Sequence, residues 1–536
     1  MVSDVPGAEI CGIVQRSIRS IPWIQQMIAA GKTRGISAKP GWWFKAQSLI
    51  HSLADKIVDW FFWFAHGCPA PLNNPKTFTI ARLTQECSKS GLPLAITDEC
   101  AEARVAASFC PADVHLVILL GEFSSISEWS ALASSGCIRA CNHESGTSLE
   151  GSSNDALISI EHWAAGKGIP FIVFSLILPW QPFDGPLGFT LKTDLIADDL
   201  LLQTAGCLLA KNAVSAPTVV SGWANKILAP SLSQLEGVGR DTAQAEHGGR
   251  RYRSTWKLCL DTLLLFSPRI LVRNWFRRMS ERYPVLILAH HLVSDRPHRM
   301  GMPTEIFWRQ VLFLQRHYHI VSLSEAAELL RSGQIRIPTV TLTFDDGYAD
   351  NFLNLRAVAN EVGIPSTLFI TIDPVETHRE FDHDLATGTT GFFPLTWDQI
   401  QYWNTRGVEF GSHTRTHFDC GSTDLEILQA EIIGSRNDLE AHLKKPVGFF
   451  AFPYGQRDNM SSEAMDLAAS TYRHFVSSFG GEALAKVKGP QSHLFRKKFY
   501  GSQWELGLEL QSVFDFVDAT RRWFLPQSTN SSRAPE

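Results

Sequence analysis

The run TLTFDDGYAD, residues 341–350, places the strongest constraint on the fold of this chain. Residues Ile337 to Phe344 are rich in β-branched and aromatic side chains, which predicts a short buried strand. Two adjacent carboxylates, Asp345 and Asp346, follow this strand and precede Gly347. Enzymes built on α/β barrels and open α/β sheets place their chemistry at the carboxyl ends of strands, because the loops converge there. The run therefore predicts an α/β protein with a site where this strand ends.

Two later segments repeat the pattern of a strand followed by polar residues. A predicted strand from Val408 to Gly411 precedes His413 and His417, and the segment FFAFPYG, residues 449–455, predicts a strand that leads into a Pro-Tyr-Gly loop. Two histidines four residues apart can direct their rings at one ion. With one carboxylate they form a three-ligand site for a divalent metal that leaves a position open for water.

The paired aspartates have a chemical explanation. Neighbouring side chains in a strand point to opposite faces, but a turn at Gly347 can let one carboxylate bind the metal while the other reaches the metal-bound water. The second carboxylate then takes the proton of that water. The attacked carbonyl becomes an oxyanion, which a backbone N–H in the rigid loop around Tyr454 can stabilise. This machinery suits hydrolysis of an amide.

With these motifs, residues 284–500 resemble the NodB-type polysaccharide deacetylases, the carbohydrate esterase family 4 group. Thr-Phe-Asp-Asp-Gly stands at 343–347, His-Thr-x-x-His at 413–417, and Pro-Tyr at 453–454. The resemblance implies an α/β fold with a distorted (β/α) barrel. It also implies roles for five residues: Asp345 as the catalytic base, Tyr454 as the source of the oxyanion-binding N–H, and Asp346, His413 and His417 as the metal ligands.

Two departures from the family pattern affect the site. The arginine that the family usually carries shortly before Pro-Tyr is replaced by Phe449 to Phe452. We expect Arg496 to be an ordinary surface arginine, with a role as the missing arginine as the alternative. The family's late Leu-x-His motif is absent after residue 455, but Leu288-Ala-His290 precedes the Asp-Asp strand, as in circularly permuted members. Our hypothesis makes His290 the general acid, against the alternative of a structural histidine; His291, on the other face, is the less favoured choice.

The chain is predicted to have four parts, divided where composition and patterning change. They are a Rossmann-like α/β domain at 1–225, a linker and connecting helix at 226–280, the deacetylase-like domain at 281–505, and a helix with a disordered tail at 506–536.

The first of these parts is similar to the formyltransferase domain of methionyl-tRNA and sugar-amine formyltransferases. Gly136 and Ile138 match, but Arg139 and Cys141 stand where that family has Asn and His. The segment Asp184-Gly185-Pro186 resembles the family's late motif, whereas Asn142 and His143 are adjacent and would point apart on a strand. We expect a noncatalytic domain.

Composition limits the partners and the location. The chain has 536 residues with a formal net charge of -5 and no basic stripe, so we expect no nucleic acid. Ten scattered cysteines without a Cys-x-x-Cys pair fit free thiols. The apolar runs are too short to span a membrane, and no signal peptide is apparent, so we expect a cytoplasmic protein. The cluster DWFFWFAHG, residues 59–67, is interpreted as a buried helix face rather than an interfacial anchor.

These observations predict a metal-dependent hydrolase that removes an N-acyl group, acetyl by expectation, from an amino sugar of a polysaccharide or glycoconjugate. Asp345 would be the base acting on metal-bound water. Zinc is the expected ion, although cobalt, nickel or iron(II) would also suit two histidines and one carboxylate. The alternatives are hydrolysis of a non-sugar amide or formamide, and an inactive carbohydrate-binding protein. A cluster of Trp397, Tyr402 and Trp403 fits a sugar-binding groove and core packing equally well, and the sequence leaves the oligomeric state open.

Overall fold

The computed structural model describes most of the chain after residue 254. The described residues there are 255–355, 364–405, 407–478, 481–482, 493–498 and 501–515. Before residue 255 it describes chiefly 13–16, 42–66, 94–97, 116–119, 137–144, 156–165 and 171–178.

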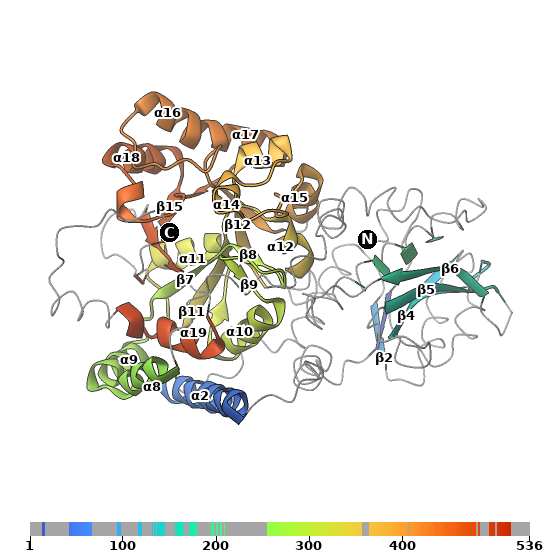
Figure 1. Cartoon of the computed structure of the whole chain (residues 1–536), viewed down its shortest axis with the longest axis horizontal. Helices are drawn as coiled ribbons and strands as arrows, with labels where there is room; N and C mark the ends of the chain where they lie inside the picture. The colour runs from blue at the N-terminus through green and yellow to red at the C-terminus, as the bar shows by residue number, and fades with distance from the viewer. Residues whose placement is uncertain are drawn as a thin grey trace.

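The C-terminal part forms a nine-stranded parallel sheet that curls into a nearly closed barrel (Figure 1). Its strands are β7 (Val285–His290), β10 (His319–Ile320), β11 (Thr339–Phe344), β12 (Ser366–Ile370), β13 (Glu409–Ser412), β14 (Phe449–Ala451), β15 (His474–Ser477), β16 (His493–Phe495) and β17 (Lys497–Lys498). β7 pairs with β11 in register from Val285 opposite Thr339 to His290 opposite Phe344. The expected α/β class and barrel are therefore confirmed, with the strand that carries His290 beside the Asp-Asp strand.

A single residue separates the strands at the two edges of the barrel sheet. β16 pairs with β15 at one edge, and β17 pairs with β7 at the other. Arg496 lies between β16 and β17, at the point where the chain crosses from one edge to the other. Lys497 is buried beside it and forms ion pairs with Glu509 at 3.1 Å and Asp515 at 2.7 Å. The pair with Glu509 holds α19 (Gln503–Leu510) beside the point where the two sheet edges meet.

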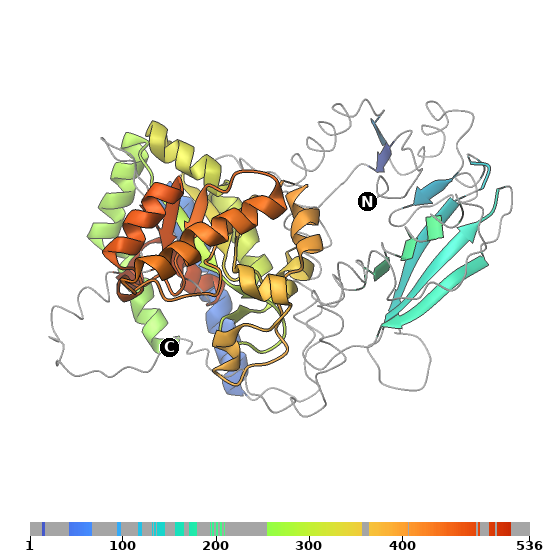
Figure 2. The same cartoon turned by 90° about the horizontal axis from the view of Figure 1, so that it is seen from above.

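Helices alternate with the barrel strands and cover their outer faces (Figures 1 and 2). They are α10 (Thr304–His317), α11 (Leu323–Ser332), α12 (Ala349–Asn354), α13 (Ile372–Thr377), α14 (Asp382–Leu385), α15 (Trp397–Asn404), α16 (Leu425–Gln429), α17 (Ser435–Leu443) and α18 (Ser462–Thr471). The Ser322 side chain caps α11, and Thr396 begins α15 with a full capping box.

The barrel strands alternate between two packed layers, as strand geometry requires. Val285 and Ile287 of β7 belong to a cluster with Phe369 and residues of α11, whereas Leu286 and Leu288 belong to the larger cluster, which includes residues of α10. Because side chains alternate along β7, His290 lies on the side of Leu286 and Leu288.

Four helices form a further layer against the barrel (Figure 1). They are α2 (Trp42–His66), α8 (Thr255–Leu263), α9 (Pro268–Ser280) and α19. Val58 of α2 is fully buried and touches Gly507 so closely that a Cβ atom there would lie 2.2 Å from its Cγ1. The predicted domain boundary at residue 226 would assign α2 to the N-terminal domain, but α2 packs against the barrel.

The remaining N-terminal strands form two small sheets. β1 (Ile13–Arg16) pairs in parallel with β2 (Leu94–Thr97). The other sheet contains β3 (Val117–Leu119), β4 (Cys137–Glu144), β5 (Ala156–Trp163) and β6 (Phe171–Leu178), with one parallel and two antiparallel pairings. A Rossmann-like fold for this part stays a prediction. Among the described residues, no helix combines the length and the apolar character needed to cross a membrane.

Candidate metal centre and active site

The backbone after β11 turns sharply at the second aspartate. Asp346 adopts a left-handed conformation with φ of 69°, and Gly347 follows with φ of 87°. The N–H of Gly347 donates to the Asp345 carbonyl at 2.8 Å. A side chain at Gly347 would also meet Ile370, since a Cβ atom would lie 3.0 Å from its Cδ1. The turn therefore favours glycine at this position.

Asp346 meets both predicted histidine ligands. Its Oδ1 lies 3.4 Å from Nε2 of His413 and 3.3 Å from Nε2 of His417. Asp346 is fully buried. Burial alone would raise the pKa of Asp346, but the rings of His413 and His417 hold that pKa well below its usual value. The structure thus brings together all three predicted metal ligands.

The three side chains fit a divalent ion. Within the described part of the chain, neither carboxylate oxygen of Asp346 has a hydrogen-bond partner, which is costly for a buried charge unless an ion satisfies it. Ligand atoms about 2.0–2.2 Å from one tetrahedral ion lie roughly 3.3–3.5 Å apart, and Asp346 Oδ1 lies at 3.4 and 3.3 Å from the two ring nitrogens. Nδ1 of His413 contacts the carbonyl of Ala451 at 2.8 Å; donation there leaves Nε2 free to bind metal.

Backbone strain gathers at this site. Besides Asp346, the non-glycine residues Thr414, His417 and Tyr454 have positive φ angles of 64°, 61° and 59°. Such conformations cost free energy and persist where the surrounding structure enforces them, which occurs mostly at functional sites. All four residues belong to the three sequence motifs.

Arg496 is a central residue of the site. Its side chain is fully buried, and its two terminal nitrogens donate to the Asp345 carboxylate at 2.6 and 2.8 Å. It also donates to Thr343 Oγ1 at 3.2 Å and Ser478 Oγ at 3.0 Å. Burial alone would raise the pKa of Asp345, but Arg496 and then His413 keep that pKa below its ordinary value. The expectation of a surface arginine was wrong, because the short crossing between β16 and β17 carries this residue into the barrel.

The structure places His290 away from this cluster. Its ring stacks on Phe344 at 5.2 Å and meets Phe307 edge-on at 5.7 Å. Burial lowers the pKa of His290 to about 4, and its Nδ1 has no hydrogen-bond partner among the described residues. His290 therefore occupies the packed layer behind β7, which fits the alternative of a structural histidine.

His291 takes the opposite orientation from His290 by strand alternation. His291 contributes to the lowered pKa of Asp345, and Asp345 opposes the lowering of the pKa of His290, so both histidines interact with this carboxyl. The packing of the His290 ring against Phe344 and Phe307 is what leaves His291 as the favoured candidate beside Asp345.

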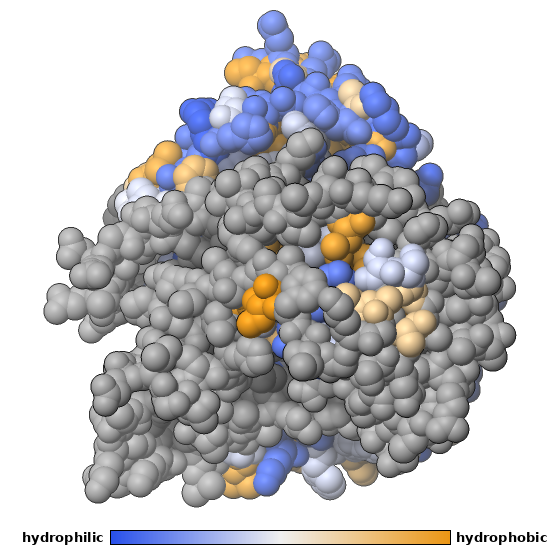
Figure 3. All heavy atoms as spheres, turned by 90° about the vertical axis from the view of Figure 1, so that its right-hand side faces the viewer, coloured by the Kyte–Doolittle hydropathy of each residue, from blue (hydrophilic) through white to orange (hydrophobic). Residues whose placement is uncertain are grey.

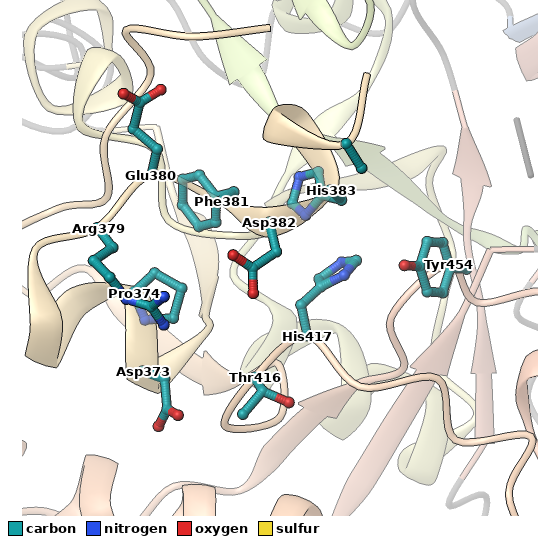
Figure 4. Close-up of a pocket in the computed structure, with 11 residues that line it drawn as sticks. Asp373, Pro374, Arg379, Glu380, Phe381, Asp382, His383, Thr416, His417 and Tyr454 are labelled. Atoms are coloured by element: carbon teal, nitrogen blue, oxygen red, sulfur yellow. The ribbon is translucent and has the colours of Figure 1, made fainter. Parts of the chain in front are cut away.

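A cavity of about 300 Å³ opens beside His417 (Figure 4). The rings of His383 and His417 lie 4.5 Å apart, and Tyr454 packs edge-on against His417 at 4.9 Å. The rest of the wall combines polar and apolar side chains: Asp373, Arg379, Glu380, Asp382 and Thr416 with Pro374, Phe381 and Ala386. Of the predicted aromatic cluster, Tyr402 and Trp403 are buried and pack on Phe352, so they belong to the core.

His383 and the hydrogen-bond network behind it were not predicted from the sequence. Nε2 of His383 lies 3.9 Å from Asp346 Oδ2 and 2.9 Å from the Tyr348 hydroxyl, which donates to Asp384 at 2.7 Å. Asp384 in turn lies 3.0 Å from Nε2 of His298. Tyr348 directly follows the Asp-Asp-Gly turn. The one signal in the sequence was the adjacent pair His383-Asp384, which has no fixed spacing to the other motifs.

Only some of the residues in the formyltransferase-like pattern belong to the described part of the structure. Arg139 of β4 forms an ion pair with Glu161 at 2.9 Å. Asn142 and His143 lie in β4, but their side chains, like the segment 184–186, lie outside the described residues. The resemblance stays a prediction.

Comparison with known proteins identifies the barrel. The family model described as polysaccharide deacetylase matches residues 333–472, which include β11 with its Asp-Asp-Gly turn and both histidines. The chain carries a polysaccharide deacetylase domain. It is 23% identical over 184 residues to YxkH, a candidate polysaccharide deacetylase of Bacillus subtilis (strain 168). That match covers 34% of this chain and 60% of the relative's length.

Solved structures of low sequence identity are also similar to the deacetylase domain. The Streptococcus pyogenes deacetylase PplD in complex with acetate is 20% identical, with a TM-score of 0.36, over 43% of this chain and 98% of that one. IcaB from Ammonifex degensii is 19% identical, with a TM-score of 0.36, over 42% of this chain and 97% of that one.

Proposed function

We propose that this protein is a metal-dependent hydrolase that removes an N-acetyl group from an amino sugar of a polysaccharide or glycoconjugate. The observation that carries this proposal is the convergence of Asp346, His413 and His417 beside Asp345, at the carboxyl ends of the barrel strands. The family match to the same residues supports it.

A divalent ion held by Asp346, His413 and His417 would supply Lewis-acid activation to water and to the acyl oxygen. Asp345 would accept the proton of the attacking water, and its ion pair with Arg496 keeps this carboxylate ionised and fixed in orientation. The water oxygen bonds to the acyl carbon, the C–N bond breaks, and the products are acetate and a free amine.

The leaving nitrogen needs a proton as the C–N bond breaks. We assign the role of proton donor to His291, because strand alternation directs it to the Asp345 side whereas His290 packs against Phe344. The backbone N–H of Tyr454 remains our candidate for binding the oxyanion, because the strained loop places this residue beside His417.

The cavity beside His417 suits a sugar better than an apolar acyl chain. Charged side chains of Asp373, Arg379, Glu380 and Asp382 can bind hydroxyl groups, and Tyr454, 38% exposed, can pack on a pyranose face. A small non-sugar amide or a formamide would leave most of these groups without partners, which makes it the weaker candidate.

The test is acetate release by the metal-loaded full chain from short N-acetylglucosamine oligomers, with formate release from N-formyl analogues measured in parallel. Acetate release that disappears in Asp345→Asn would support the proposal. If the loaded enzyme releases no acetate but does release formate, the acyl group is wrong. If it releases neither from any sugar, the substrate class is wrong.

A further inference from the structure

The outer face of three helices exposes an unusual number of large apolar side chains. We call this face the α2–α8–α9 face. Between 40% and 66% of each of these residues is exposed: Ile50, Leu53, Trp60, Trp63, Phe64, Trp256, Leu260, Leu263, Phe266, Val272, Trp275, Phe276 and Met279. A contiguous apolar area of this kind on a protein surface usually marks an interaction site.

The helix α2 is apolar on two sides. Val58, Phe61 and Phe62 are fully buried against the barrel, whereas Trp60 and Phe64 stack on each other at 6.0 Å on the exposed side. The interpretation of the cluster DWFFWFAHG as a buried face is therefore right for Phe61 and Phe62 and wrong for Trp60, Trp63 and Phe64. Core packing gives no reason for the three exposed aromatic side chains.

The three elements form one continuous surface. The ring centres of Trp60 in α2 and Phe266 lie 6.4 Å apart. Phe266 is the last residue of η3 (Leu264–Phe266), the short helical turn that joins α8 to α9. In α9 the inward positions are Ile270 and Asn274, and the outward ones include Trp275 and Phe276, whose rings meet at 5.0 Å.

This surface is also basic. Residues 255–282 contain six Lys and Arg against two Asp and Glu, a net charge of +4, in a chain whose total is -5, and α2 adds two Lys and two Asp. Two of the six, Arg273 and Arg277, bind inward to Gln511 and Glu482 and do not contribute to the exposed charge. Arg269, Arg278 and Arg282 are exposed, and Lys257 lies over the ring of the exposed Trp256 at 5.6 Å. In Figure 3 the described residues at the lower edge, where α2 lies in Figure 1, mix hydrophobic and hydrophilic types, whereas those at the top are mostly hydrophilic.

We propose that the α2–α8–α9 face binds the surface of an anionic lipid bilayer. Exposed tryptophan, phenylalanine and leucine side chains would enter the interface between headgroups and acyl chains, and the flanking Lys and Arg would lie at the lipid phosphates. The excess of positive charge on this face would be attracted to a negatively charged membrane. A second copy of the same face carries the same charge and would be repelled, so the charge favours a membrane over a dimer partner.

Binding there would leave the catalytic site open. The last residue of α2, His66, packs on Tyr283 at 6.3 Å, and α9 ends at Ser280, so both helices end near the start of β7. The aspartates and metal ligands lie at the other end of the strands. The proposal is therefore independent of the proposed activity.

The test is co-sedimentation of the full chain with vesicles of phosphatidylcholine alone and of phosphatidylcholine with phosphatidylglycerol. The variants are the double substitution Trp275→Ser and Phe276→Ser, and the single substitution Arg278→Glu. The matched control is Leu425→Ser with Ile427→Ser, which removes two comparably exposed apolar side chains from α16. Circular dichroism checks that each variant is folded. If the double variant does not fold, Arg278→Glu alone tests the proposal.

We expect the wild type and the α16 control to sediment with the anionic vesicles and to be released by high salt. The double variant should lose at least about tenfold in partitioning, and Arg278→Glu about fivefold. Absence of wild-type binding to anionic vesicles would overturn the proposal. An equal loss of vesicle binding in the α16 control would also overturn it. A third contradictory result would be a wild-type dimer in light scattering that the double substitution dissociates, with no vesicle binding by any form.

Discussion

Arg496 binds both carboxylate oxygens of Asp345, at 2.6 and 2.8 Å, from the single residue that separates the strands at the two edges of the barrel. Closure of the barrel and orientation of Asp345, the proposed base, therefore depend on the same residue. The guanidinium neutralises a buried carboxylate and leaves it in the ionised form that a base requires.

Arg496→Lys should lower kcat by roughly tenfold to a hundredfold while the metal content stays near that of the wild type. Lysine keeps the charge but cannot donate two parallel hydrogen bonds to one carboxylate. Arg496→Met should be more damaging, because it leaves Asp345 buried and unpaired at a cost of about 3–5 kcal/mol in unfolding free energy. Acetate release, bound metal and chemical unfolding measure the three effects. Arg331→Lys, in an exposed ion pair with Glu328, is the control and should change none of them.

His413→Ala combined with His417→Ala should abolish metal binding. Removing two of three ligands leaves one carboxylate, which cannot hold a divalent ion tightly. Metal content of the purified protein is the direct measurement, and the activity should fall with it. His442→Ala removes a histidine that contacts Glu376 at 3.0 Å on the surface, and it should retain the metal. Metal near the wild-type level in the double variant would refute the ligand assignment.

His291→Ala and His290→Ala should behave differently. Loss of a proton donor slows cleavage of an amide, whose leaving nitrogen must be protonated, far more than cleavage of an aryl acetate, whose leaving group needs no proton. We expect His291→Ala to lose about a hundredfold in kcat on the sugar amide and little on the aryl ester. His290→Ala should reduce stability, since it empties space against Phe344 and Phe307, and keep kcat per folded molecule. The reverse pattern would restore His290 as the acid.

The clustering of Asp346, His413 and His417 was predictable because motif spacing and strand patterning are local properties of the sequence. Asp346, His413 and His417 each follow a strand that the sequence indicates, and parallel strands bring such residues to one end of the barrel. Arg496 was not predictable, because its position depends on how the last strands close the barrel.

The sequence also could not predict on which face of the strand His290 lies. The strand end at 288–291 was predicted, but a shift of one residue exchanges the two histidines between faces.

Acid should weaken the attachment of α2 to the barrel through His66. Burial, with the nearby His317 and Arg277, lowers the pKa of His66 to about 3, while its ring contacts Tyr283 and Tyr318 and its Nδ1 contacts the His317 carbonyl at 3.2 Å. The unfolded chain takes up this proton below its ordinary pKa of 6.5, and the folded chain does not until about pH 3.

The stabilisation from neutral His66 is therefore complete above pH 6.5 and declines as the pH falls from 6.5 toward 3, by about 2 kcal/mol at pH 5. Hydrogen exchange of the α2 amides at pH 7 and pH 5, corrected for intrinsic rates, measures this loss. His66→Phe keeps an aromatic ring without a titrating group, so its α2 should lose about 2 kcal/mol less over the same interval. Equal pH dependence in the wild type and His66→Phe would show that another group controls the attachment of α2.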